Sequence, residues 1–140
     1  MKVKECFMAR ELGEFLGFCT IVFFVLAMLN YVVKFINRKF GSSLKAYPRF
    51  QIAFSFFLNF IVKWHKLFGL LSIMTLLAHF LIQLNNFGIR LTGVMAAILL
   101  LVQGALGIYG AKARHKGKSW IIIHRTIAVL LLVAIIVHVA

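Results

Sequence analysis

The chain has 140 residues, of which 63% are hydrophobic, and its 16 basic and 3 acidic side chains give a formal net charge of +13. Charged residues make up only 14% of the sequence, against about a quarter in an average soluble domain, so the composition argues against a soluble fold. The basic residues stand where apolar runs end, which favours the loops of a membrane protein over a nucleic-acid binder.

Four apolar runs are long enough to cross a bilayer core, which takes about 20 residues of helix. In chain order we expect helices over Leu12–Val33, Trp64–Leu84, Ile89–Ala111 and Ser119–Ala140. The N-terminus lacks the pattern of a cleaved signal peptide, so we expect the first run to stay as an anchor. The sequence thus predicts one all-α domain over residues 1–140, an up-and-down transmembrane four-helix bundle.

The longest connection, residues 41–63, contains Pro48, the only proline. We expect Gly41 to stop the first helix. The apolar run from Phe50 to Val62 is interrupted by polar residues and is too short to span a bilayer. It is therefore predicted to form a short interfacial segment or a bent extension of the second helix.

The basic residues predict an orientation. We define side A as the side of the connections at 41–63 and 112–118, and side B as the opposite side, which holds both termini. Twelve of the 16 basic residues fall on side A, and such an excess marks the cytoplasmic side. We expect an integral protein of the cell's inner membrane, surrounded by lipid, with both termini outside. Trp64 and Trp120 fall at one depth on side A, as interfacial anchors do.

Four of the five histidines lie in the expected spans, in two pairs of equal spacing. His65 and His79 are 14 residues apart, and so are His124 and His138. Fourteen helical residues make nearly four full turns and rise about 21 Å, so both members of a pair point the same way, one near each face. Because the second and fourth helices run in the same direction, His65 is level with His124 near side A, and His79 is level with His138 near side B.

We name His65 with His124 level A, and His79 with His138 level B. Two opposed imidazoles at one depth, on facing helices, are what a haem iron needs, so we expect a haem at each level. Structural histidines explain the matched spacing, depth and helix direction less well. Zinc takes three or four ligands that converge on one point. These histidines lie at two depths, so a zinc site is less favoured. Since no C-x-x-C-H motif is present, the two haems should be non-covalent haem b.

Glycines on the third helix repeat this spacing. Gly93 and Gly107 are 14 residues apart, and in an antiparallel helix Gly107 falls at level A and Gly93 at level B. Glycine lets a flat ring approach the backbone, so we expect both glycines, and Gly69 on the second helix, to line the haems. Small-residue helix packing is the alternative. Lys66 and Arg125 are candidate partners for haem propionates on side A.

Three further residues or motifs have expected roles near the levels. The Gly13-xxx-Gly17 pattern on the first helix should serve helix packing, with close approach of a haem at Gly17 as the less favoured alternative. His115, in the basic loop, should be a solvated residue, with a proton or propionate contact at level A as the alternative. His138 stands two residues from the last residue, so we expect level B to be the less ordered level.

The arrangement of histidines and glycines resembles the haem-bearing half of the di-haem cytochromes b of quinol-oxidising complexes. The motif His65-Lys-Leu-Phe-Gly69, with a second histidine 14 residues after the first, and the pair His124-Arg125 also resemble the ferric reductase-like transmembrane family. The resemblance covers about residues 12–140 and implies one bis-histidine haem at each level. This sequence holds no flavin- or NAD-binding domain and no recognisable quinone-site motif.

The expected function is transmembrane electron transfer between two haems about 21 Å apart. Quinol, a soluble flavoprotein docked on the basic face, ferric iron and superoxide are candidate partners, and whether the chain is itself an oxidoreductase stays open. Two imidazoles on each iron leave no position for oxygen. The alternatives are a haem-bearing membrane anchor subunit of a larger oxidoreductase, and a non-redox four-helix membrane scaffold. The sequence does not predict the oligomeric state.

Overall fold

The computed structural model describes residues 2–44, 46–113 and 117–140, with side chains from residue 7 onward. These residues form four helices, α1 (Lys2–Leu44), α2 (Pro48–Phe87), α3 (Leu91–Lys112) and α4 (Lys118–Val139). Each helix is long and apolar enough to cross a membrane, which confirms the all-α transmembrane prediction. His115 lies outside the described residues, and its role stays a prediction.

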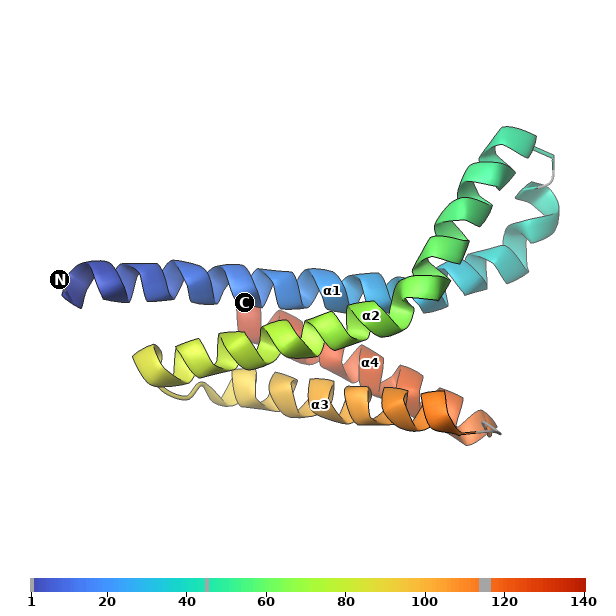
Figure 1. Cartoon of the computed structure of the whole chain (residues 1–140). Helices are drawn as coiled ribbons and strands as arrows, with labels where there is room; N and C mark the ends of the chain where they lie inside the picture. The colour runs from blue at the N-terminus through green and yellow to red at the C-terminus, as the bar shows by residue number, and fades with distance from the viewer. Residues whose placement is uncertain (1, 45, 114–116) are drawn as a thin grey trace.

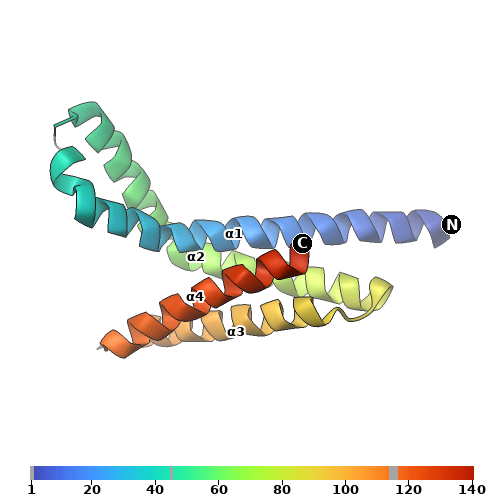
Figure 2. The ribbon, with the colours of Figure 1, turned by 180° about the vertical axis from the view of Figure 1, so that it is seen from behind.

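The helices run up and down in chain order, so α1 and α2 form one hairpin and α3 and α4 form the other (Figure 1). Seen from behind, α4 lies between α1 and α3 (Figure 2). Close backbone approaches are concentrated within each hairpin, with fewer between α2 and α3. The bundle therefore consists of two tight hairpins joined mainly through side chains.

The first two helices are much longer than a membrane span. They have 43 and 40 residues, whereas crossing the hydrocarbon core takes about 20. On side A the end of α1 and the start of α2 leave the bundle together, drawn in teal and green in Figure 1. We define this projection, residues 38–44 and 48–60, as the arm.

The region expected as a separate connection at 41–63 is thus divided between two helices. The prediction that Gly41 stops the first helix is wrong, because α1 continues through it to Leu44. α2 begins at Pro48, since proline suits the first helical turn, where its missing N–H has no partner to lose. The bent extension of the second helix is the interpretation that matches the structure (Figure 1). The basic residues mark the end of the membrane crossing and leave the helix itself intact.

The short turn between α2 and α3 depends on one glycine. Gly88 has φ 80° and ψ −169°, a backbone conformation that is open essentially to glycine alone. It is the one described residue with positive φ. α2 continues through Phe87, so the turn is shorter than the sequence predicts, and it brings α3 back antiparallel to α2.

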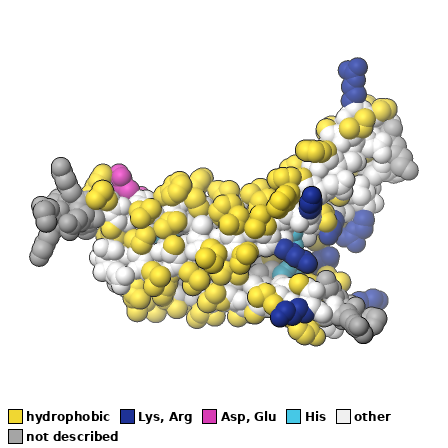
Figure 3. All heavy atoms as spheres, in the orientation of Figure 1, with side chains coloured by type: hydrophobic (Ala, Val, Ile, Leu, Met, Phe, Trp, Pro, Cys, Tyr) yellow, Lys and Arg dark blue, Asp and Glu magenta, His cyan; other side chains and the backbone are white. Residues whose placement is uncertain are grey.

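The centre of the bundle is packed midway between the two histidine levels. Leu100 of α3 and Leu131 of α4 are 4% and 1% exposed, and each stands seven residues from both paired glycines or histidines of its helix. Phe24 of α1 and Leu76 of α2 complete the cluster, which we name the central layer. The outer surface of the bundle carries apolar side chains, as contact with lipid requires (Figure 3).

Candidate functional site

Three side chains of α2, spaced by seven residues, form hydrogen bonds to main-chain carbonyls of α1. The contacts are His65 Nδ1 to the Ala27 carbonyl at 2.9 Å, Ser72 Oγ to the Thr20 carbonyl at 3.1 Å, and His79 Nδ1 to the Gly13 carbonyl at 2.8 Å. The accepting carbonyls are also seven residues apart along α1, which is the heptad spacing of helices packed side by side. We name these three contacts the ladder. They set the register of α1 against α2 and fix the direction of both imidazoles.

The ladder also determines which nitrogen of His65 and of His79 stays free. A main-chain carbonyl only accepts hydrogen bonds, so Nδ1 must carry the proton in both neutral rings. Nε2 is then left as a bare lone pair. Histidines that bind metals almost always show this arrangement, in which the nitrogen away from the metal donates to a carbonyl or a carboxylate.

At level B two imidazoles face each other across the bundle. The ring centroids of His79 and His138 are 6.5 Å apart, with an interplanar angle of 77°. Two imidazoles bound on opposite sides of one metal, with metal–nitrogen bonds of about 2 Å, have centroids about 6 Å apart. His138 Nδ1 lies 3.0 Å from the hydroxyl oxygen of Thr92, so this ring too can donate from Nδ1 and keep Nε2 free. The structure therefore brings together the pair that the sequence predicts.

Glycines on two helices make room for these imidazoles. A Cβ at Gly17 would lie 3.1 Å from Cε1 of His79, and a Cβ at Gly93 would lie 2.8 Å from Cε1 of His138. Gly93 thus stands at level B, as its spacing predicts, where it accommodates the imidazole. Gly17, for which helix packing is favoured over close approach of a haem, packs against the other ring of the same level.

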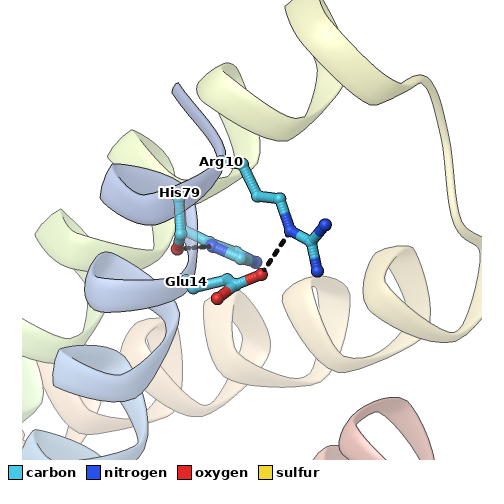
Figure 4. Close-up of polar contacts among 4 residues, drawn as sticks. Arg10, Glu14 and His79 are labelled. Carbon is cyan, nitrogen blue, oxygen red and sulfur yellow. Dashed lines mark hydrogen bonds and ion pairs between the residues drawn. The ribbon is translucent and has the colours of Figure 1, made fainter. Parts of the chain in front are cut away.

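An ion pair borders level B. Arg10 Nε donates to Glu14 Oε1 at 2.8 Å, on the turn of α1 whose Gly13 carbonyl contacts His79 (Figure 4). Both charged side chains are exposed, so their attraction adds little to stability. The pair does cancel two charges close to His79, which leaves this part of level B nearly neutral.

Level A is built differently around His124. Trp120 stacks on its imidazole, with ring centroids 5.1 Å apart and an interplanar angle of 13°, and the Gln103 amide donates to His124 Nε2 at 3.2 Å. His124 Nδ1 and Gln103 Oε1 are buried without a hydrogen-bond partner. Each such atom costs about 1–3 kcal/mol, so level A holds unsatisfied polar groups. His65 acts electrostatically on His124, so the two imidazoles lie within the range of a charge interaction, and their sharing of one level stays a prediction.

Trp120 is turned toward α3, and its role as an interfacial anchor stays a prediction. Its indole N–H donates to the Leu106 carbonyl at 3.1 Å, and its ring occupies the space that a Cβ of Gly110 would need. Trp64, in contrast, is 39% exposed on side A. Sequence position predicts the depth of both tryptophans, whereas the inward turn of Trp120 depends on the missing side chain of Gly110.

The remaining residues expected at level A lie beside open space or near the surface. A Cβ at Gly69 or Gly107 would meet nothing within 4 Å, so helix packing does not require glycine at either position. Arg125 places its Cζ 4.5 Å from the ring centroid of Tyr31 in a cation–π contact. Lys66 is exposed. These two cations flank the two histidines of level A in the sequence and give this level a positive surrounding.

The sequence interpretation missed residues that contact the level histidines. Gln103 is a polar residue in an apolar helix, one turn from Gly107, and that position alone is a signal of function within a membrane. Thr92 precedes Gly93 and offers a weaker signal. The main-chain carbonyls of Gly13 and Ala27 could not be identified from the sequence, because every residue has a main-chain carbonyl.

Among the residues that the structure describes, no three side chains of His, Cys, Asp or Glu form a group that could hold a metal ion. Comparison of the chain with known protein families, curated proteins and solved structures finds no match.

Proposed function

We propose that the chain is a b-type cytochrome that carries electrons across a membrane, with one haem held at each level. The ladder is the observation that supports this most directly. It fixes both imidazoles of α2 through Nδ1, to carbonyls 14 residues apart, and leaves both Nε2 atoms bare. A histidine that only joined two helices would gain nothing from a fixed, unpaired Nε2, whereas a metal ligand requires one.

The available ligands suit haem better than a bare ion. Haem brings its own equatorial nitrogens, so the protein needs to add only axial ligands, and two imidazoles per level meet that need. Zinc takes three or four converging ligands, which the described residues do not offer. The open space at Gly69 and Gly107 also supports the proposal, because small-residue packing fails to explain either glycine.

Each part of the chain has a defined role in this proposal. Haem would supply single-electron exchange, at a potential that the ligating histidines, their hydrogen bonds and their burial would tune. His65 and His124 would hold one haem, and His79 and His138 would hold the other. The carbonyls of the ladder keep the α2 imidazoles in one tautomer and raise their basicity as ligands. The glycines and cations expected near the haems are Gly69, Gly93, Gly107, Lys66 and Arg125.

The resemblance to di-haem cytochromes b and to ferric reductase-like proteins supports the same class of activity. Quinol, a soluble flavoprotein, ferric iron and superoxide are the partners that this class of chemistry suits. Two imidazole ligands per iron leave no position for direct reaction with oxygen. The chain is therefore proposed as an electron carrier between partners on opposite faces of the membrane.

The test is the haem content of the full-length protein, purified in detergent from cells supplied with a haem precursor. We expect two haems per chain that acid-acetone extracts, with the absorption spectrum of six-coordinate low-spin iron. A colourless protein would contradict the proposal and support a non-redox scaffold. High-spin haem that binds carbon monoxide rapidly would contradict the bis-histidine assignment.

We infer also that side A faces the cytoplasm in the cell's inner membrane, because 12 of the 16 basic residues lie there. The test uses a chain in which Cys6→Ser and Cys19→Ala remove the native thiols. A cysteine placed at Ser43 or Gly117 should resist an impermeant thiol reagent in intact cells and react after lysis. Reaction in intact cells would reverse the orientation and leave the histidine pairs unchanged.

A further inference from the structure

A shallow hollow, open along most of its extent, lies on the outer surface of α1 where the arm begins. Its volume is about 410 Å³, and its lining residues are Tyr31, Phe35, Arg38 and Lys39, which follow one another along one face of the helix. All four side chains are exposed, so the hollow is open to the surroundings on side A. Figure 3 shows Lys and Arg side chains gathered at this end of the molecule, in the angle between the arm and the bundle.

Aromatic rings hold cations at this hollow. Arg125 reaches from α4, with its Cζ 4.5 Å from the ring centroid of Tyr31. Lys39 Nζ lies 6.0 Å from the ring centroid of Phe35. Contacts of this kind orient a charged group and leave N–H bonds for an acceptor. Arg38 and Lys39 thus line the hollow, and Arg125 of α4 lies beside it against Tyr31.

The sequence offers these cations no carboxylate. All three acidic residues fall within the first 14 residues, and no Asp or Glu occurs from residue 15 to residue 140. Glu14 pairs with Arg10 near level B, at the other end of the bundle. Cations that cluster without internal compensation attract an anion from outside the chain.

The neighbouring arm indicates that this anion belongs to the lipid layer. Phe50, Ile52 and Phe56 of the arm are 58%, 72% and 75% exposed. Apolar side chains beside basic ones settle at the boundary between headgroups and acyl chains. Basic pockets next to transmembrane helices, on the side with excess positive charge, bind anionic headgroups.

We propose that the hollow binds the phosphate headgroup of an anionic phospholipid, with phosphatidylglycerol as the simplest case. Arg38 and Lys39 donate charge-assisted hydrogen bonds to phosphate oxygens, and Arg125 adds positive charge at the rim. The rings of Tyr31 and Phe35 contact the glycerol backbone and the first part of the acyl chains. This site does not depend on haem and is tested separately from the proposed function.

The test measures binding of short-chain phosphatidylglycerol and phosphatidylcholine to the full-length protein in detergent, by native mass spectrometry. The wild type should prefer phosphatidylglycerol by about tenfold or more, because both lipids carry the phosphate but the cations repel the quaternary ammonium of phosphatidylcholine, which also neutralises its headgroup. Arg38→Gln combined with Lys39→Gln should abolish this preference. Arg49→Gln combined with Lys63→Gln removes the same charge from the same side of the membrane, outside the hollow, and should keep it.

Three results would overturn the proposal. Equal loss of the preference in both double variants would reduce the effect to diffuse attraction. Displacement of the lipid by inorganic phosphate at equal concentration would make free phosphate the ligand, and tighter binding of polyglutamate would assign the surface to an acidic protein. If the Arg38 and Lys39 variant does not fold, these two competitions on the wild-type protein decide the question.

Discussion

The two histidine levels have the same spacing in the sequence and different surroundings in the structure. At level B both Nδ1 atoms have a partner, the Gly13 carbonyl for His79 and the Thr92 hydroxyl for His138. At level A only His65 has such a partner, while His124 Nδ1 has none and its Nε2 accepts from Gln103. In the proposed function, both level B histidines therefore have a free Nε2 before haem binds. At level A, the Gln103 amide must first leave Nε2 of His124.

The charge around the two levels differs as well. Level B adjoins the Arg10–Glu14 pair and has one cation, Arg90, acting on His138. At level A, Lys34 and Lys66 act on His65 and Arg125 acts on His124. Positive charge favours the reduced, less positive state of a bound redox centre. The same histidine spacing is thus expected to give two unequal centres, with the higher potential at level A.

The largest effect is expected when a histidine of one level is replaced, because each substitution should remove the haem of that level alone. His65→Ala or His124→Ala should remove the level A haem, and His79→Ala or His138→Ala should remove the level B haem. Each variant should keep about half of the haem, because each iron depends on two axial ligands. The measurement is a pyridine haemochrome assay, with potentiometric titration to identify the remaining centre.

His115→Ala is the matched control and should keep both haems. Depletion of one and the same haem by His65→Ala and His79→Ala would show that the pairing is wrong. A lower potential for the haem left in His79→Ala than for the haem left in His65→Ala would contradict the electrostatic difference between the levels.

The next effect compares the glycines of α3. Gly93→Val adds a side chain where a Cβ alone would lie 2.8 Å from Cε1 of His138. The substitution should therefore cost about 1–3 kcal/mol of stability and remove the level B haem. Gly107→Val meets open space and should remove the level A haem without destabilising the haem-free protein. Thermal unfolding of the haem-free variants and their haem content test both statements. Full haem binding by Gly107→Val would show that its open space is not used.

A smaller effect concerns the amide at level A. Gln103→Leu removes the donor on His124 Nε2, a hydrogen bond with a net worth of about 0.5–1.5 kcal/mol, so haem affinity at level A should rise by about 2- to 10-fold. Titration of haem into the haem-free protein gives the dissociation constants. Gln83→Leu, one turn after His79, is the control and should leave both constants unchanged. Weaker binding by Gln103→Leu would mean that the amide supports the site.

The smallest effect is expected at the middle contact of the ladder. Ser72→Ala removes the hydrogen bond to the Thr20 carbonyl and should destabilise the protein by about 0.5–1.5 kcal/mol, with both haems kept. Ser55→Ala, at an exposed position of the arm, should change nothing measurable in the same thermal unfolding assay. Equal unfolding temperatures for the two variants would show that the ladder does not hold α1 to α2.

The features shared by the two levels could be predicted from the sequence. The paired spacing of the histidines, with helix direction counted along the chain, predicts which histidines share a level, and Gly93 stands against its histidine for the same reason. Apolar runs predict the four spans well, because lipid admits almost no other way to satisfy the backbone.

The features that distinguish the two levels could not be predicted from the sequence. The partners of His65 and His79 are main-chain carbonyls, which leave no mark on residue type. Charge and glycine predict a stop at Gly41, but a helix outside the lipid tolerates both, so α1 continues to Leu44. The final turn of α4 is helical through Val139, so the position of His138 near the last residue does not predict a disordered level.

The central layer separates the two levels with apolar side chains. Phe24, Leu76, Leu100 and Leu131 are all at most 9% exposed. In the proposed function, each electron that passes from one level to the other would therefore cross this apolar layer. It would move one unit of charge through the membrane, at about 2.3 kcal/mol per 100 mV of potential. The protein would thus charge or discharge the membrane, according to which side supplies the electron.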